Sequence, residues 1–89
     1  MAMRALARAA AQEGAARAAE LHLALAETAA RRRGSPHEVA CNRLCRAQID
    51  AMAGRRGAAR EALEQAEPEF AALGMQWHWM QTRRLLDAV

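Results

Sequence analysis

Small and apolar residues recur every three or four positions along most of the chain, the spacing that places them on one side of an α-helix. Glycines interrupt this pattern, and the segments between them predict five helices. These segments span residues 2–12, 15–33, 36–52, 58–73 and 76–88. Alanine, the best helix former, is abundant, and β-branched residues are almost absent. The sequence therefore predicts an all-α protein.

One segment of this pattern occurs twice, 40 residues apart. The first copy reads Leu23-x-x-Ala26-x-x-x-Ala30-x-x-Arg33-Gly34, and the second reads Leu63-x-x-Ala66-x-x-x-Phe70-x-x-Leu73-Gly74. A fixed period of this length is the signature of stacked helical repeats. We therefore expect one domain over residues 1–89, an antiparallel helix-hairpin stack with helix pairs 2–33 and 35–73 and a capping helix 76–88.

The spacing also predicts which side each helix buries. The second helix presents Ala19, Leu23, Ala26 and Ala30 on one side, the fourth presents Ala59, Leu63, Ala66, Phe70 and Leu73, and the first presents Met3, Leu6, Ala7 and Ala10. Because the apolar spacing continues on both sides of Pro68, we expect one bent helix there rather than two. At the start of the third helix, Ser35 can cap, Pro36 fits the first helical position, and Glu38 can reach back to the cap amide.

The motif Gly54-x-x-x-x-Ala59-x-x-x-Leu63-x-x-Ala66, echoed by Gly14-x-x-x-x-Ala19-x-x-x-Leu23-x-x-Ala26, resembles the tetratricopeptide repeat. The period resembles the longer repeats in regulatory arms of bacterial transcription activators and nucleotide cyclases. The resemblance implies a non-enzymatic protein-interaction module, as a whole protein or a segment of a larger regulatory one. Its partner would be an extended peptide or a helix in a concave groove lined by the first helix of each pair.

Carrying the groove positions over one helix at a time gives a candidate binding site on the first, third and fifth helices. The site comprises Arg4, Arg8, Cys41, Leu44, Gln48, Gln81 and Arg84. Arginine binds carboxylates through two parallel hydrogen bonds, so an acidic peptide suits the site. Trp77 and Trp79 are two apart on one helix and cannot both enter one core. The one that faces out, for which we take Trp77, is a candidate partner anchor.

The charge pattern allows a second class of function. The net charge is +3, all 13 basic residues are arginine, and they cluster at Arg31 to Arg33, Arg55 with Arg56, and Arg83 with Arg84. A small helical domain with such clusters can dock on phosphates, so nucleic-acid binding is the alternative. Base-reading residues come closest to sharing one face at Asn42, Arg43, Arg46 and Gln48.

Candidate chemistry is sparse. His37, Cys41 and Cys45 share one stripe of the third helix and suit zinc or copper, but they span about 12 Å of axis and cannot all reach one ion. A two-ligand site completed by a later helix stays open beside the simpler interpretation that the cysteines are apolar fillers. The only serine is Ser35, and Asp50 and Asp87 are isolated. We therefore expect no catalytic residues, metal or cofactor.

Two cysteines, no lysine and the absence of a signal-peptide pattern favour a reducing cytoplasmic setting, and the resemblance implies a bacterial one. No apolar run approaches the roughly 20 residues that span a bilayer, so no membrane association is expected. A short chain with few repeats also makes self-association possible.

Overall fold

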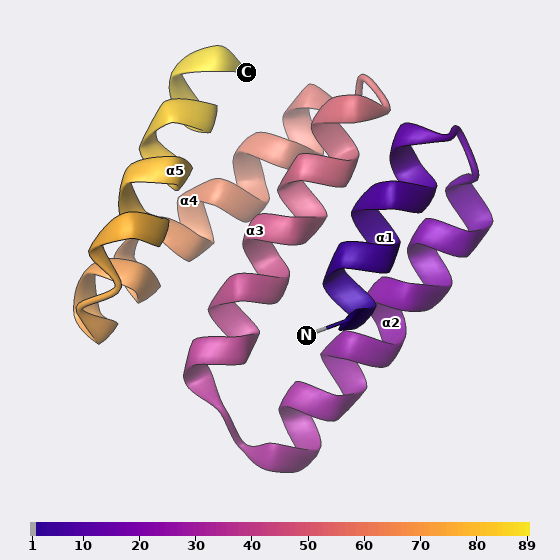
Figure 1. Ribbon diagram of the computed structural model, residues 1–89. Helices are drawn as coiled ribbons and strands as arrows, with labels where there is room; N and C mark the ends of the chain where they lie inside the picture. Colours follow the sequence, from indigo (N-terminus) through magenta and orange to yellow (C-terminus); the bar gives the residue numbers. More distant parts are fainter. Residues whose placement is uncertain (1) are drawn as a thin grey trace.

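The computed structural model describes residues 2–89, and over this range the chain forms five α-helices with no strand (Figure 1). They are α1 (Ala2–Gln12), α2 (Ala16–Arg33), α3 (Pro36–Met52), α4 (Arg56–Leu73) and α5 (Gln76–Ala88). The all-α prediction is confirmed. The largest difference from the expected boundaries is that α4 begins at Arg56 rather than at residue 58, because Gly57 is helical.

The helices form two antiparallel hairpins and one further helix. α1 packs on α2 and α3 packs on α4, both α1 and α2 contact α3, and α5 lies mainly on α4 with a smaller contact to α3. Figure 1 shows the two hairpins side by side with α5 beyond α4. The molecule measures 33 × 32 × 18 Å, a slab about two helices thick, since packed helix axes lie about 8–10 Å apart.

Four glycines 20 residues apart set the length of each helix and turn. Gly14, Gly34, Gly54 and Gly74 have φ values of 77°, 60°, 80° and 70°, in the left-handed region that a residue with a Cβ atom rarely adopts. At the ends of α2 and α4, the glycine amide and the following residue's amide donate to carbonyls of the last helical turn. The 40-residue repeat is therefore built from two such units of 20 residues.

The stripes predicted for α2 and α4 form the core. Ala19, Leu23, Ala26 and Ala30 are buried on α2, as are Ala59, Leu63, Ala66 and Phe70 on α4. Leu73, predicted to join them, is only partly buried. The prediction for α1 is wrong at Leu6, which is 44% exposed, whereas Ala7 and Ala10 are buried and Met3 is partly buried.

Local signals at α3 and α4 act largely as the sequence indicates. The Ser35 hydroxyl accepts the Glu38 amide at 3.2 Å, and Pro36 opens α3. The Glu38 carboxylate does not reach back to the cap amide, because it binds the Arg33 guanidinium, with Arg33 Nε donating to Oε2 at 2.7 Å. α4 continues through Pro68 as one helix.

Candidate partner-binding groove

Six of the seven side chains predicted for the partner-binding site line one hollow of about 280 Å³. Its walls are Arg4 and Arg8 from α1, Cys41, Leu44, Cys45 and Gln48 from α3, and Trp77, His78 and Gln81 from α5. Residues 73 positions apart in the chain thus share one concave surface, which we call the groove. The seventh predicted residue, Arg84, is exposed on α5 outside this hollow.

Helical spacing explains why each helix contributes a small set. Arg4 and Arg8 lie four apart on α1, and Trp77 and Gln81 lie four apart on α5, so each pair stands one above the other. α3 lies between these helices and supplies the floor. The position 40 residues after Leu44 is Arg84, which is exposed because no helix of residues 2–89 packs on that side of α5.

The basic wall of the groove is held in place by α3. Arg4 Nη1 donates to the Oδ1 atom of Asn42 at 2.9 Å, and Asn42 is only 3% exposed. The Cys45 thiol lies 3.8 Å from the carbonyl oxygen of Arg4, close enough for a weak hydrogen bond. These contacts join α1 to α3 and orient a guanidinium group at the groove.

Aromatic rings connect the core to the opposite wall. Phe70, fully buried on α4, stacks on His78 with ring centroids 5.3 Å apart, and His78 meets the edge of Trp77 at 5.0 Å. Trp77 itself is 64% exposed. Trp79 is half-buried and donates from Nε1 to Glu67 on α4 at 3.1 Å. The expectation that only one tryptophan packs inward is met, and Trp77 is the one that faces out.

The two cysteines in the groove are not set up for thiolate chemistry. Burial raises the pKa of the Cys41 thiol, with Arg4 opposing the shift and Glu38 adding to it. Burial also raises the pKa of Cys45, against the opposing charges of Arg8 and Arg4. In the protein without a bound metal both thiols are therefore mainly protonated at neutral pH, whereas nucleophilic attack requires the thiolate. Within residues 2–89, no three His, Cys, Asp or Glu side chains gather as a metal site would require.

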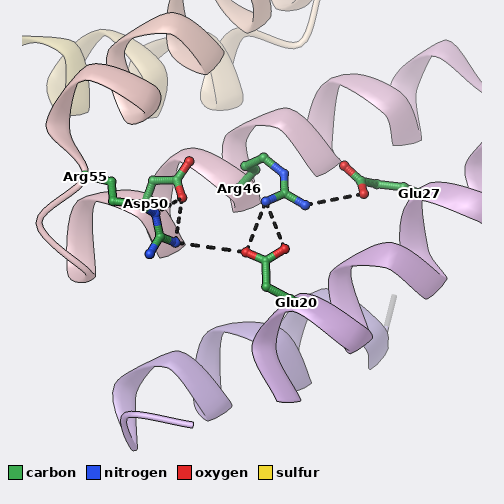
Figure 2. A network of polar contacts seen from close by, with 5 residues as sticks. All are labelled: Glu20, Glu27, Arg46, Asp50 and Arg55. Atoms are coloured by element: carbon green, nitrogen blue, oxygen red, sulfur yellow. Dashed lines mark hydrogen bonds and ion pairs between the residues drawn. The ribbon is translucent and has the colours of Figure 1, made fainter. Parts of the chain in front are cut away.

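Sequence reasoning missed a network of ion pairs on another side of the molecule (Figure 2). Arg46 of α3 lies between two acids of α2, at 3.1 Å from Glu20 and 3.5 Å from Glu27. Asp50 was expected to be isolated and is instead 5% exposed, with its carboxylate 2.8 Å from Arg55. The sequence does contain one signal for the Asp50–Arg55 pair. Arg55 directly follows Gly54, and the turn at Gly54 brings Arg55 back against the last turn of α3.

This network borders a hollow of about 570 Å³, larger than the groove, between the α1–α2 turn and the α3–α4 turn. Most of its lining is small and apolar, including Ala11, Ala16, Ala19 and Met52. The charged side chains at its edge pair with one another, Arg46 with Glu20 and Arg55 with Asp50.

The structure also separates the residues that a base-reading helix would need on one face. Asn42 is buried, Arg43 pairs with Glu69 of α4 at 2.8 Å, and Arg46 pairs with α2. Gln48 instead lines the groove. Of the predicted arginine clusters, Arg31 donates to Thr28, Arg33 binds Glu38 and Arg55 binds Asp50.

Comparisons with known proteins give no further guide, because no family model, curated protein or solved structure matches this chain. The class of protein is accordingly defined by the fold itself, an all-α stack of antiparallel helix hairpins. None of the helices in residues 2–89 has both the length and the apolar character needed to cross a lipid bilayer.

Proposed function

We propose that the chain is a non-enzymatic protein-interaction module of the tetratricopeptide kind, which binds an extended acidic peptide in the groove. One observation carries the proposal: α1, α3 and α5 bring Arg4, Arg8, Gln48 and Gln81 together with the exposed Trp77 around one hollow. Guanidinium and amide groups suit backbone carbonyls and carboxylates, and a partly exposed tryptophan supplies apolar contact area.

The setting we propose is the bacterial cytoplasm, where the chain serves a regulatory assembly. Two free thiols, one of them buried, favour a reducing compartment. The arginine-rich and lysine-free composition agrees with the codon usage of a GC-rich genome. The guanidinium and amide groups of the groove favour one class of partner, an extended segment with several carboxylates.

Binding of a fluorescent library of Asp- and Glu-rich peptides with free C-terminal carboxylates tests this function. Anisotropy gives the affinity, and tryptophan emission, recorded in the Trp79→Phe background so that Trp77 is the emitter, reports whether the peptide enters the groove. Arg8→Gln should weaken binding roughly ten- to a hundredfold, because a charge-assisted hydrogen bond contributes roughly 1.5–3 kcal/mol. Arg84→Gln is the matched control, since Arg84 lies on α5 outside the hollow.

Equal weakening by the two substitutions would contradict the groove, because it would indicate a general charge effect. The same titration with single- and double-stranded DNA is the second arm. If the chain binds DNA more tightly than any peptide, and if that binding falls steeply with salt, the nucleic-acid alternative replaces the proposal.

A further inference from the structure

A hollow of about 240 Å³ lies between α2 and α3, and it shares no lining residue with the groove or with the larger hollow near the turns. Its walls are Glu27 and Arg31 of α2 and Val39, Asn42 and Arg43 of α3. We call it the Asn42 pocket. Its volume is several times the share of one water molecule in the liquid, about 30 Å³, so a small organic molecule fits in it.

The pocket contains a buried amide group that lacks a hydrogen-bond partner. Asn42 is 3% exposed, and one end of its amide faces Arg4 of α1, which lies outside the pocket. A guanidinium only donates, so the Asn42 atom facing Arg4 is the oxygen. The Nδ2 atom has no partner among residues 2–89. Buried donors are rarely left unpaired, because each loses its water without a replacement, so Nδ2 is a donor that Asn42 offers to a ligand.

The charges around the pocket leave one cation without an acid. Two of its charged residues pair with neighbouring helices, Glu27 with Arg46 (Figure 2) and Arg43 with Glu69. Within residues 2–89, Arg31 meets no acid and donates to the neutral hydroxyl of Thr28 at 3.3 Å. The donors that the pocket holds for a ligand are therefore the guanidinium of Arg31 and the amide of Asn42. A carboxylate, which accepts several hydrogen bonds, suits both.

The 40-residue repeat shows what the equivalent place holds at the α4–α5 junction. Three residues of the pocket, Val39, Glu27 and Asn42, have as their equivalents Trp79, Glu67 and Thr82. The indole of Trp79 donates to Glu67 across this junction at 3.1 Å. Thr82 is fully buried, and its hydroxyl donates to the carbonyl oxygen of His78 at 2.9 Å. The second junction thus has an aromatic ring and a satisfied polar group where the first has a valine and an unpaired amide.

We propose that the Asn42 pocket binds a small aromatic carboxylate. The ring lies against Val39, in the place that the indole of Trp79 takes at the second junction. The carboxylate accepts from Nδ2 of Asn42 and from the guanidinium of Arg31. The residue equivalent to Arg31 at the second junction is Ala71, so only the first junction combines room for a ring with a cation beside it.

A water molecule or a small inorganic anion suits the pocket less well. Either accepts a hydrogen bond from Asn42, but neither covers the apolar part of the wall beside Val39. Apolar lining with a few convergent polar groups is the usual composition of a site for a small organic ligand. The inference stands apart from the proposed peptide function, because no residue lines both the pocket and the groove.

Titration of the full chain with indole-3-acetate, which carries the ring of tryptophan and a carboxylate, tests the proposal. Calorimetry gives the affinity. Asn42 is the only asparagine, so its side-chain amide gives one pair of NMR signals, which its loss in Asn42→Thr identifies and which should shift on binding. Indole, without the carboxylate, and acetate, without the ring, are the matched ligands.

Three variants locate the ligand. Val39→Trp copies the residue of the second junction and takes the place of the ring, so it should abolish binding. Arg31→Gln should weaken the binding of indole-3-acetate roughly ten- to a hundredfold and leave the affinity for indole unchanged, because only the carboxylate meets the guanidinium. Arg32→Gln is the matched control, since Arg32 is exposed beside Arg31 and does not line the pocket. Circular dichroism checks the fold of each variant.

We expect indole-3-acetate to bind at least about tenfold more tightly than indole or acetate, since each of these lacks one of the two interactions. An absence of binding at millimolar concentration overturns the proposal. So does acetate that binds as tightly as indole-3-acetate, which indicates an adventitious anion only. Binding that persists in a folded Val39→Trp places the ligand elsewhere. If that variant does not fold, equal affinities of Arg31→Gln and Arg32→Gln overturn the proposal.

Discussion

The α2–α3 and α4–α5 junctions occupy equivalent positions in the repeat and are stabilised by different chemistry. At the first, Arg46 pairs with Glu20 and Glu27, and Arg33 binds Glu38. The residues at the equivalent positions of the second junction, 40 positions later, differ in chemical type. They are Leu86, Arg60, Glu67, Leu73 and His78. Ion pairs therefore lie at both ends of the first junction, beside the buried apolar cluster that joins α2 to α3.

The second junction is held mainly by aromatic packing. Phe70 replaces Ala30, is fully buried and stacks on His78, and Trp79 bonds to Glu67. Arg60, which takes the place of Glu20, donates to the carbonyl oxygen of Leu86 at 3.3 Å near the end of α5. One backbone arrangement thus accepts two sets of side chains, because the small residues at the crossing points fix the spacing and leave the rest free to differ.

The largest effect expected from this comparison is that of Phe70→Ala. Removing a fully buried phenylalanine leaves a cavity and costs about 3–5 kcal/mol, a large part of the stability of a domain this small. Urea unfolding followed by circular dichroism measures the loss. Trp77→Ala is the control, since a 64% exposed side chain should change the free energy of unfolding by at most about 0.5 kcal/mol. Equal losses would contradict the account in which the burial of Phe70 stabilises the α4–α5 junction.

A smaller effect is expected for Arg46→Leu, which gives the first junction the residue that the second has at Leu86. The ion pairs of Arg46 are partly exposed, so their loss should cost about 0.5–1 kcal/mol at low salt. The sharper readout is the dependence of the unfolding free energy on sodium chloride. That dependence should flatten in the variant and persist in Arg84→Leu, because salt screens the pairs that the variant lacks. An unchanged salt dependence would contradict the electrostatic account of this junction.

The smallest effect concerns pH. The hydrogen bond from Arg33, with its charge, lowers the pKa of Glu38 in the folded protein. Because the pKa of Glu38 is lower in the folded than in the unfolded protein, its ionised carboxylate stabilises the fold above the unfolded-state pKa. This stabilisation is lost as the pH falls through the folded-state pKa. Arg33→Gln should return the pKa of Glu38 toward its usual value, as NMR titration of the carboxyl carbon measures. The pair is exposed, so the free energy of unfolding should change little. If the pKa of Glu38 is the same in Arg33→Gln as in the unmodified protein, the pairing is ruled out.

Local signals in the sequence predicted most of the helix boundaries. The break at Gly34, the cap at Ser35 and the proline at Pro36 place the α2–α3 turn without any tertiary information, because each acts within one helical turn. The stripe of Ala19, Leu23 and Ala26 was equally readable, since a helix turns its residues at a constant angle. The boundary at Gly57 was missed because a glycine inside a helix gives the same local signal as one in a turn.

The candidate groove was predictable in part. Helical spacing and the repeat resemblance placed six residues of the predicted site, together with Trp77, on the correct helices. Cys45, His78 and the exclusion of Arg84 depend on how α1 and α5 lie against α3. Partners far apart in the chain were not predictable, as Arg46 with Glu20 and Glu27 shows. No local rule distinguishes an arginine that meets an acid on another helix from one that meets water.

The sequence by itself determined the helices, the glycine turns and the inward stripes of α2 and α4, because these depend on backbone conformation and on the angle between neighbouring residues. Only the tertiary structure decided which of two apolar sides is covered. Leu6 and Leu63 are both leucines on helical stripes, yet Leu6 is 44% exposed and Leu63 is fully buried. The difference arises because burial depends on whether another helix lies opposite, and in the described chain nothing packs on the outer side of α1.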